Sequence, residues 1–148
     1  HHVAALRMLL GEVADVSAHI ALNREDLPPA DTLTSTLKFE NGALGTYTIT
    51  YAKESPLATP LTVLGDAGAL CVKDAQVELT RTGQAVEIFE VESYQGVPNE
   101  FAAFAAAIRS RENHVNTPQQ ALQDVAVVEA LVQSAETGQH VTVPRITG

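Results

Sequence analysis

The spacing of hydrophobic residues predicts helices near both ends of the chain and strands between them. Near the N-terminus, Leu6, Leu9 and Leu10 form an apolar stripe over residues 1–10, and Gly11 is suited to end that helix. A second stripe, spaced at i, i+3, i+4 and i+7, predicts an amphipathic helix whose aromatic residues pack on a sheet. This stripe consists of Phe101, Phe104, Ala105 and Ile108.

The C-terminal part of the chain carries a clear helix start. Thr117 is followed by Pro118 and Gln120, the pattern of an N-cap residue, a first-turn proline and a capping box. Gly138 is expected to end this helix, and the segment HVTV at 140–143 predicts a short final strand. We expect the buried stripe of the helix to be Leu122, Val125, Val128 and Val132.

A hairpin is predicted where Asn41-Gly42 separates two runs rich in β-branched and aromatic residues, TLTSTLKFE and ALGTYTITY. A two-residue turn would pair Glu40 with Ala43 and place the Tyr and Ile side chains of the second strand together on one face. That face would hold Tyr47, Ile49 and Tyr51 across from Thr36, Thr34 and Thr32, and the other face Phe39, Leu44, Leu37, Thr46, Leu33 and Thr50.

Neither predicted face is strongly charged, so both need cover. We expect the chain's own helices to cover one face and a partner sheet or a neighbouring subunit to cover the Tyr47–Ile49–Tyr51 face. The alternative is a moderately polar face that stays exposed to solvent.

Further strands are predicted by alternation and by turn residues. The expected class is α+β: an open, predominantly antiparallel β-sheet with helices packed on one face, in one domain over residues 1–148. The strands are expected at 13–22, 61–64, 69–73, 76–81 and 85–92, with a loop at 24–30 and turns at 65–68, 74 and 82–83.

Composition narrows the functional classes. The chain has 18 acidic against 9 basic residues, a formal charge of −9, which repels nucleic acid and anionic membrane surfaces. No stretch is long and apolar enough to span a bilayer, and no secretory signal is visible. Cys71 is the only cysteine, which excludes an internal disulfide and favours a reducing, cytoplasmic location.

Common catalytic motifs are missing from the sequence. It contains no Gly-x-Gly-x-x-Gly or P-loop pattern, no His-Glu-x-x-His or paired Cys-x-x-Cys, and no Gly-x-Ser-x-Gly. We therefore expect no metal site and no cofactor-binding site in this chain alone. Asp124 and Glu129 are interpreted as a solvated helix face rather than an acid and base pair.

His1 and His2 are the best candidates for chemistry, because an imidazole exchanges a proton near neutral pH with little tuning. Two other interpretations are open: they are the end of a purification tag, or a helix-start histidine that only caps local structure.

Five segments in the same order resemble the C-terminal domain of the glucose-fructose oxidoreductase, inositol dehydrogenase and MocA-like (Gfo/Idh/MocA) family. They span nearly the whole chain, and the last is the most specific. The segments are HHVAALRMLLGE, FENGALGTY, GDAGAL, VPNEFAAFAAAI and TPQQALQDVAVVEALVQSAETGQHVTV.

The resemblance implies a parent NAD(P)-dependent oxidoreductase acting on a sugar, polyol or related hydroxy compound. NAD or NADP would be bound mainly by a nucleotide-binding domain that precedes this chain, so the isolated chain would be inactive. This chain would bind substrate and form a homo-oligomer through its open sheet face. His1 matches the family's catalytic histidine, which exchanges a proton with the substrate hydroxyl.

Arg7, Tyr51 and Lys53 are the predicted substrate-binding residues, with residues 51–56 as a pocket loop; ordinary surface positions are the alternative. The chain departs from the family pattern at Ala4, often acidic, and at Met8, often aromatic. These departures keep a second hypothesis open, a noncatalytic ligand-sensing or interaction module of the same architecture. A self-contained hydrolase or lyase is a third, for which no nucleophile and base can be assembled.

Overall fold

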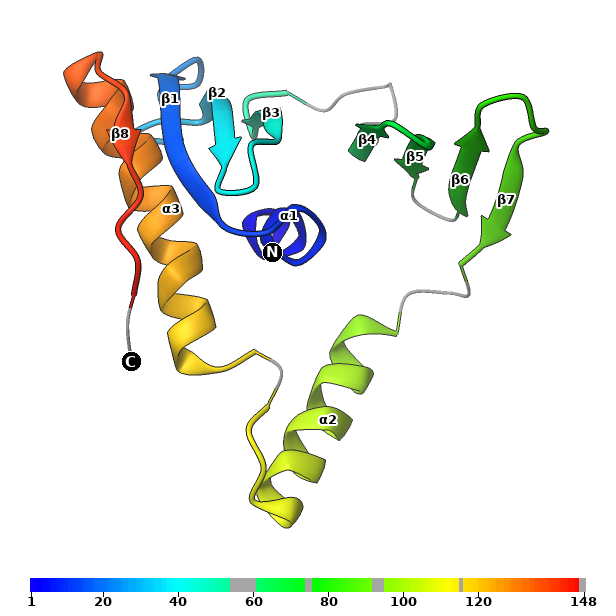
Figure 1. Cartoon of the computed structure of the whole chain (residues 1–148). Helices are drawn as coiled ribbons and strands as arrows, with labels where there is room; N and C mark the ends of the chain where they lie inside the picture. Colours follow the sequence, from blue (N-terminus) through cyan, green and yellow to red (C-terminus); the bar gives the residue numbers. More distant parts are fainter. Residues whose placement is uncertain (54–60, 74–75, 92–94, 115, 147–148) are drawn as a thin grey trace. The chain divides into compact units, whose positions relative to one another are not determined.

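A computed structural model describes residues 1–53, 61–73, 76–91, 95–114 and 116–146 (Figure 1). The chain forms two compact units. The first combines His1–Lys53 with Asn113–Gly148, and the second is Glu54–Glu112. Within the described residues, no helix combines the length and hydrophobicity needed to cross a membrane.

The first unit is a four-stranded antiparallel sheet with helix α3 on one face, as the sequence predicted. The strands lie in the order β3-β2-β1-β8, and Figure 1 shows α3 running alongside β1 and β8. Gly11 and Gly138 end α1 and α3 with positive φ angles of 86° and 67°. The elements are α1 (His2–Leu10), β1 (Val13–Ala21), β2 (Thr32–Phe39), β3 (Leu44–Thr50), α3 (Pro118–Thr137) and β8 (Val141–Thr142).

Alternation along β1 and β2 builds the core of this unit. Val16 lies opposite Leu37 and Ala18 opposite Ser35, so these side chains point together toward α3, which packs on β1. Ser134 of α3 links the two layers, because its Oγ accepts a hydrogen bond from Ala18 N at 3.0 Å. The buried hydrophobic residues are Val3, Val13, Val16, Ala18, Leu37, Phe39, Ala126, Val127, Ala130, Leu131 and Val143.

The buried stripe predicted for α3 is wrong. Leu122, Val125, Val128 and Val132 are all exposed. The helix carries a second stripe, displaced by one residue along the sequence from the predicted one. Ala126 and Ala130 in this second stripe let the helix backbone approach β1 closely. The buried residues are Gln123, Ala126, Val127, Ala130, Leu131 and Ser134.

The predicted register of the hairpin is also wrong, by one residue. Phe39 N donates to Ala43 O at 2.9 Å, and Gly42 N donates to Phe39 O at 2.9 Å. The loop therefore has three residues, 40–42, with Gly42 at φ 90°. Leu33 pairs with Ile49 and Ser35 with Tyr47, so Tyr47 and Ile49 lie on the helix-covered face.

The opposite face of this sheet is polar rather than apolar. Threonine hydroxyls pair across β2 and β3, with Thr32 Oγ1 2.8 Å from Thr50 Oγ1 and Thr34 Oγ1 3.0 Å from Thr48 Oγ1. We call it the threonine face. It consists of Ser17, His19, Thr32, Thr34, Thr36, Lys38, Leu44, Thr46, Thr48 and Thr50.

The second unit contains another antiparallel sheet, in the order β4-β5-β6-β7. The predicted strands are found, the last one shorter than expected, while the predicted turn at 74 lies outside the described residues. Phe101 and Phe104 are 71% and 54% exposed, so among the described residues the two rings are not buried against a sheet as predicted. The elements are β4 (Leu61–Gly65), β5 (Gly68–Val72), β6 (Gln76–Arg81), β7 (Glu87–Glu90) and α2 (Gly96–Ser110).

Candidate functional site

A cleft of about 420 Å³ lies in the first unit, on the helix side of the sheet. The N-terminus of α1 and the middle of α3 form two of its walls, and β3 with the residue after it forms the third. It brings imidazole, phenol and carboxylate groups together with aliphatic side chains. The lining residues are His1, His2, Val3, Tyr47, Ile49, Tyr51, Asp124, Val125 and Val128.

The two histidines stand at the start of α1. His1 occupies the N-cap position, where its carbonyl accepts from Ala5 N at 3.0 Å, but its side chain makes no capping hydrogen bond. His2 Nδ1 lies 3.4 Å from Tyr47 Oη, and the two rings meet edge to face with centroids 6.2 Å apart. His2 is thus tied to the sheet, whereas the imidazole of His1 forms no hydrogen bond within the described residues.

The corrected hairpin register supplies the phenol wall. Tyr47 and Ile49 point to the helix side of β3, and Tyr51 follows at the same spacing of two. Burial, with a smaller contribution from Tyr51, raises the pKa of the Tyr47 phenol above its ordinary value. Tyr47 therefore stays protonated at neutral pH and can donate a hydrogen bond to a ligand or to His2.

Asp31 fixes two backbone segments near this wall: the loop between β1 and β2, and the residue that follows β3. Its buried carboxylate accepts from the backbone N–H of Asn23 at 2.8 Å and of Arg24 at 2.7 Å, and from the hydroxyl of Thr32 at 2.8 Å. Its carbonyl accepts from Tyr51 N at 2.8 Å. The loop between β1 and β2 therefore anchors Tyr51 at the mouth of the cleft.

Asp124 is held from behind by Arg7. Arg7 is only 8% exposed, and all five N–H groups of its guanidinium have acceptors. Nε and Nη2 each donate to Glu12 at 2.9 Å, Nη1 donates to the carbonyl of Gln120 at 3.0 Å and to Asp124 Oδ1, and Nη2 donates to Gln120 Oε1 at 2.7 Å. Gln120 was predicted to complete a capping box with Thr117; Thr117 does accept from Gln120 N, but the Gln120 side chain serves Arg7 instead.

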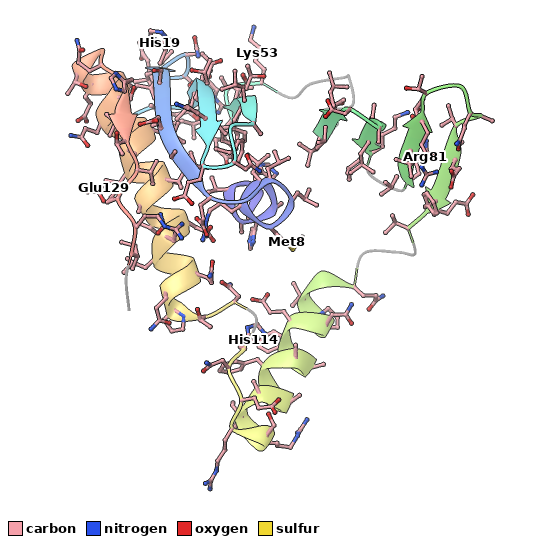
Figure 2. The ribbon with its side chains drawn as sticks, in the orientation of Figure 1. Met8, His19, Lys53, Arg81, His114 and Glu129 are labelled. Carbon is pink, nitrogen blue, oxygen red and sulfur yellow. The ribbon has the colours of Figure 1, made fainter. Side chains whose placement is uncertain are left out.

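The predicted site residues fall into two groups. His1 and Tyr51 line the cleft, together with His2. Arg7 lies behind it with no donor left for a ligand, because the ion pairs with Glu12 and Asp124 and the contacts to Gln120 use every N–H. Lys53 is exposed and does not line the cleft; Figure 2 shows it projecting away from α1. The predicted pocket loop at 51–56 is described only as far as residue 53.

Comparison with known proteins identifies the domain to which this cleft belongs. Residues 1–143 match the family described as "Oxidoreductase family, C-terminal alpha/beta domain", the C-terminal domain of Gfo/Idh/MocA proteins. The chain belongs to this family.

Individual members show how much of a protein the chain represents. It is 26% identical to dehydrogenase FPY6 of Fusarium mangiferae over 144 residues, 91% of this chain and 41% of that protein. The crystal structure of an oxidoreductase from Thermotoga maritima superposes with a TM-score of 0.85 at 31% identity, over 97% of this chain and 42% of that one. A levoglucosan dehydrogenase in complex with NADH and L-sorbose gives 0.86 at 18% identity, over 99% and 50%, a likeness of fold. The chain spans less than half the length of the first two proteins.

Three lining residues of this Gfo/Idh/MocA domain escaped the sequence analysis. Tyr47 and Ile49 were assigned to the opposite face by the register error, and Asp124 was assigned to a solvated helix surface. One signal for Asp124 was present, since it lies four residues before Val128 and therefore on the same side of the helix as that apolar residue. Among the described residues, no three His, Cys, Asp or Glu side chains group as a metal site would require.

Proposed function

We propose that this chain forms the substrate-binding wall of an NAD(P)-dependent oxidoreductase that acts on a sugar, polyol or related hydroxy compound. The observation that carries the proposal is the cleft in which His1 stands beside two phenols and a carboxylate. Imidazole, phenol and carboxylate groups are suited to holding hydroxyl groups and accepting a proton from one of them. The family match begins at residue 1, which supports His1 and His2 as parts of the domain rather than a tag.

In this proposal His1 is the proton acceptor and the rest of the cleft orients the substrate. The imidazole of His1 has no partner within the described residues, so a ring nitrogen is available to a substrate hydroxyl. Tyr47 and Tyr51 donate hydrogen bonds to neighbouring oxygens, and Ile49, Val125 and Val128 supply apolar surface against the carbon skeleton. When the hydroxyl is oxidised, its proton passes to His1 and the carbon–oxygen single bond becomes a carbonyl.

The cofactor would be held by another part of the parent protein. A nicotinamide bound there would supply the hydride acceptor that oxidation of a carbinol carbon requires, which is chemistry that side chains cannot supply. This chain has no glycine-rich phosphate loop, so its own residues do not fit the nucleotide. We therefore propose that the isolated chain is inactive and that its roles in the parent protein are substrate binding and proton transfer. A cytoplasmic location is part of the same proposal.

The threonine face is our candidate for self-association, with a second copy of the chain as its occupant. The prediction of an oligomer through Tyr47, Ile49 and Tyr51 does not hold in that form, because Tyr47 and Ile49 lie on the helix side. The open side of the sheet remains, and four of its threonines already pair with one another, so a second sheet can cover them at little desolvation cost.

The role of His1 is tested in the full-length protein that carries this chain. A panel of sugars and polyols is assayed with NAD and with NADP by the absorbance of the reduced nicotinamide. His1→Ala should lower kcat/KM by about 10²–10⁴-fold, the usual contribution of a general base. His140→Ala is the matched control, because His140 is exposed between α3 and β8, outside both the cleft and the threonine face; it should leave the rate unchanged.

Two outcomes contradict the proposal. Unchanged turnover in His1→Ala removes His1 from the mechanism. Binding of polyols without oxidation by the wild-type protein with either cofactor favours the noncatalytic ligand-sensing module instead.

A further inference from the structure

The charges around the cleft discriminate between classes of hydroxy compound. Among the described lining residues, Asp124 is the only carboxylate and there is no lysine or arginine. A substrate that carries its own carboxylate or phosphate needs a cation to pair with. Within the described part of the lining, only the imidazoles of His1 and His2 could supply one, and His1 must start neutral to accept the substrate proton in the proposed function.

The cation nearest to Asp124 is already used. Arg7 is shared between Glu12 and Asp124, and its five N–H donors are all engaged. Arg145 pairs with Glu12 at 2.9 Å and lies 3.5 Å from Glu40. The connected cluster thus sets two guanidinium groups against three carboxylates, which leaves it one negative charge in excess.

Asp124 also has an oxygen to offer. Arg7 donates to Oδ1, and Oδ2 makes no hydrogen bond within the described part of the chain. The carboxylate is 23% exposed and its neighbour Val125 lines the same cleft. An ionised carboxylate accepts hydrogen bonds only, so it can receive a substrate hydroxyl but repels a second carboxylate.

We infer that the substrate class is a neutral polyhydroxy compound, and that Asp124 is the residue of this chain that selects it over its acidic counterpart. The inference rests on the proposed function and deepens it. The negative charge in excess around Arg7 acts in the same direction, because a negative field disfavours the approach of anions. Arg7 is a positioning residue in this scheme: it holds Asp124 Oδ1 and leaves Oδ2 to the substrate.

The test compares substrates that differ only in charge, in the full-length protein with its nicotinamide cofactor. A neutral sugar, the uronic acid of the same configuration and the corresponding amino sugar are assayed for kcat/KM. We expect the neutral sugar to exceed the uronic acid by at least about tenfold, the size of a like-charge contact in a partly screened site. Asp124→Asn keeps an acceptor for Arg7 and should reduce that ratio by about tenfold through faster turnover of the acid.

Glu129→Gln is the matched control. It removes the same charge from the same helix, but Glu129 is exposed and does not line the cleft, and Figure 2 shows it on the side of α3 away from α1. The neutral-to-acid ratio should be unchanged in this variant. An equal change in both variants would mean that the net charge of the protein, and not Asp124, sets the preference.

The remaining outcomes separate the two proposals. Oxidation that depends on His1 but prefers the uronic acid, or the amino sugar by about tenfold or more, overturns the neutral class and leaves the proposed function standing. An unchanged ratio in Asp124→Asn removes Asp124 as the selecting residue. If Asp124→Asn does not fold, the wild-type ratios alone decide the substrate class. The absence of oxidation of all three compounds overturns both proposals.

Discussion

At the scale of single residues, Arg7 shows how a residue predicted for binding serves in the support of the site. The sequence suggested that Arg7 faces the substrate as a cation. Arg7 is instead buried, and its five donors join α1 to Glu12, the residue before β1, and to α3. A buried guanidinium is stable only when its donors are satisfied. The acceptors around Arg7 are therefore required for the stability of the fold.

Glu12 provides a pH test of that network. The hydrogen bonds and charge of Arg7, with Arg145 contributing, lower the pKa of Glu12 despite its partial burial. A carboxylate whose pKa is depressed by folding stabilises the folded state fully above its ordinary value of 4.5, and that stability is lost as the pH falls through the folded value. The contribution of Glu12 should therefore be present at neutral pH and disappear in acid.

Urea unfolding of Glu12→Gln against the wild type measures this contribution. We expect a loss of about 1–3 kcal/mol in the free energy of unfolding near pH 7, since the change weakens a charged hydrogen-bond pair with a buried partner. At an acidic pH well below the ordinary value of 4.5 the difference should shrink. The exposed Glu136→Gln should show little difference at either pH. A loss for Glu12→Gln that is equal at both pH values would contradict the assignment.

At the scale of elements, one glycine determines the face of a strand. The hairpin closes with a three-residue loop in which Gly42 has φ 90°, and this extra residue reverses every side chain of β3 relative to a two-residue turn. Tyr47 consequently faces α1 and α3 rather than a partner subunit. The cleft exists because of that loop.

A pair of glycine substitutions tests the loop. Gly42→Ala should destabilise the chain by about 1–2 kcal/mol, because a side chain at positive φ is strained even where space is open. Gly45→Ala is the control: its Cβ would lie 3.5 Å from Phe39 Cε2, an ordinary contact, and the change should stay within about 0.5 kcal/mol. Equal effects in thermal or urea unfolding would argue against the three-residue loop.

At the scale of the whole molecule, the first unit has one covered face and one open face. The covered face builds the core and the cleft, and the threonine face is left to a second copy of the chain in our proposal. Thr34 lies near the middle of this face, with His19 opposite it on β1 and Thr48 opposite it on β3. In a symmetric interface, a charge placed at Thr34 would therefore lie close to the same charge on the second copy of the chain.

Sedimentation equilibrium tests the interface. The wild-type chain should self-associate at high concentration, and Thr34→Arg should weaken association at least about tenfold through burial of unpaired like charges. Gln133→Arg adds the same charge at an exposed position on α3 and should leave association intact. A wild-type chain that stays monomeric, or a Thr34→Arg variant that associates as before, would exclude this face.

The sequence by itself determined where the helices and strands lie, the α+β class and the resemblance to the Gfo/Idh/MocA family. These features depend on signals within a few residues: the i, i+3, i+4 spacing near Phe101, the Thr117-Pro118 start and the alternation along β2. Such signals specify an element without naming its neighbours.

Only the tertiary structure decided which surfaces meet. Helix α3 carries two apolar stripes, and packing against β1 selected the one with Ala126 and Ala130 because small side chains allow close approach. The hairpin register depends on the conformation of Gly42. The dipeptide Asn41-Gly42 is compatible with both a two-residue and a three-residue loop, so the sequence alone does not choose between them. The contact of Arg7 with Asp124 joins residues 117 positions apart, so no local pattern encodes it. The cleft depends on all three: the packed face of α3, the hairpin register and the contact of Arg7 with Asp124.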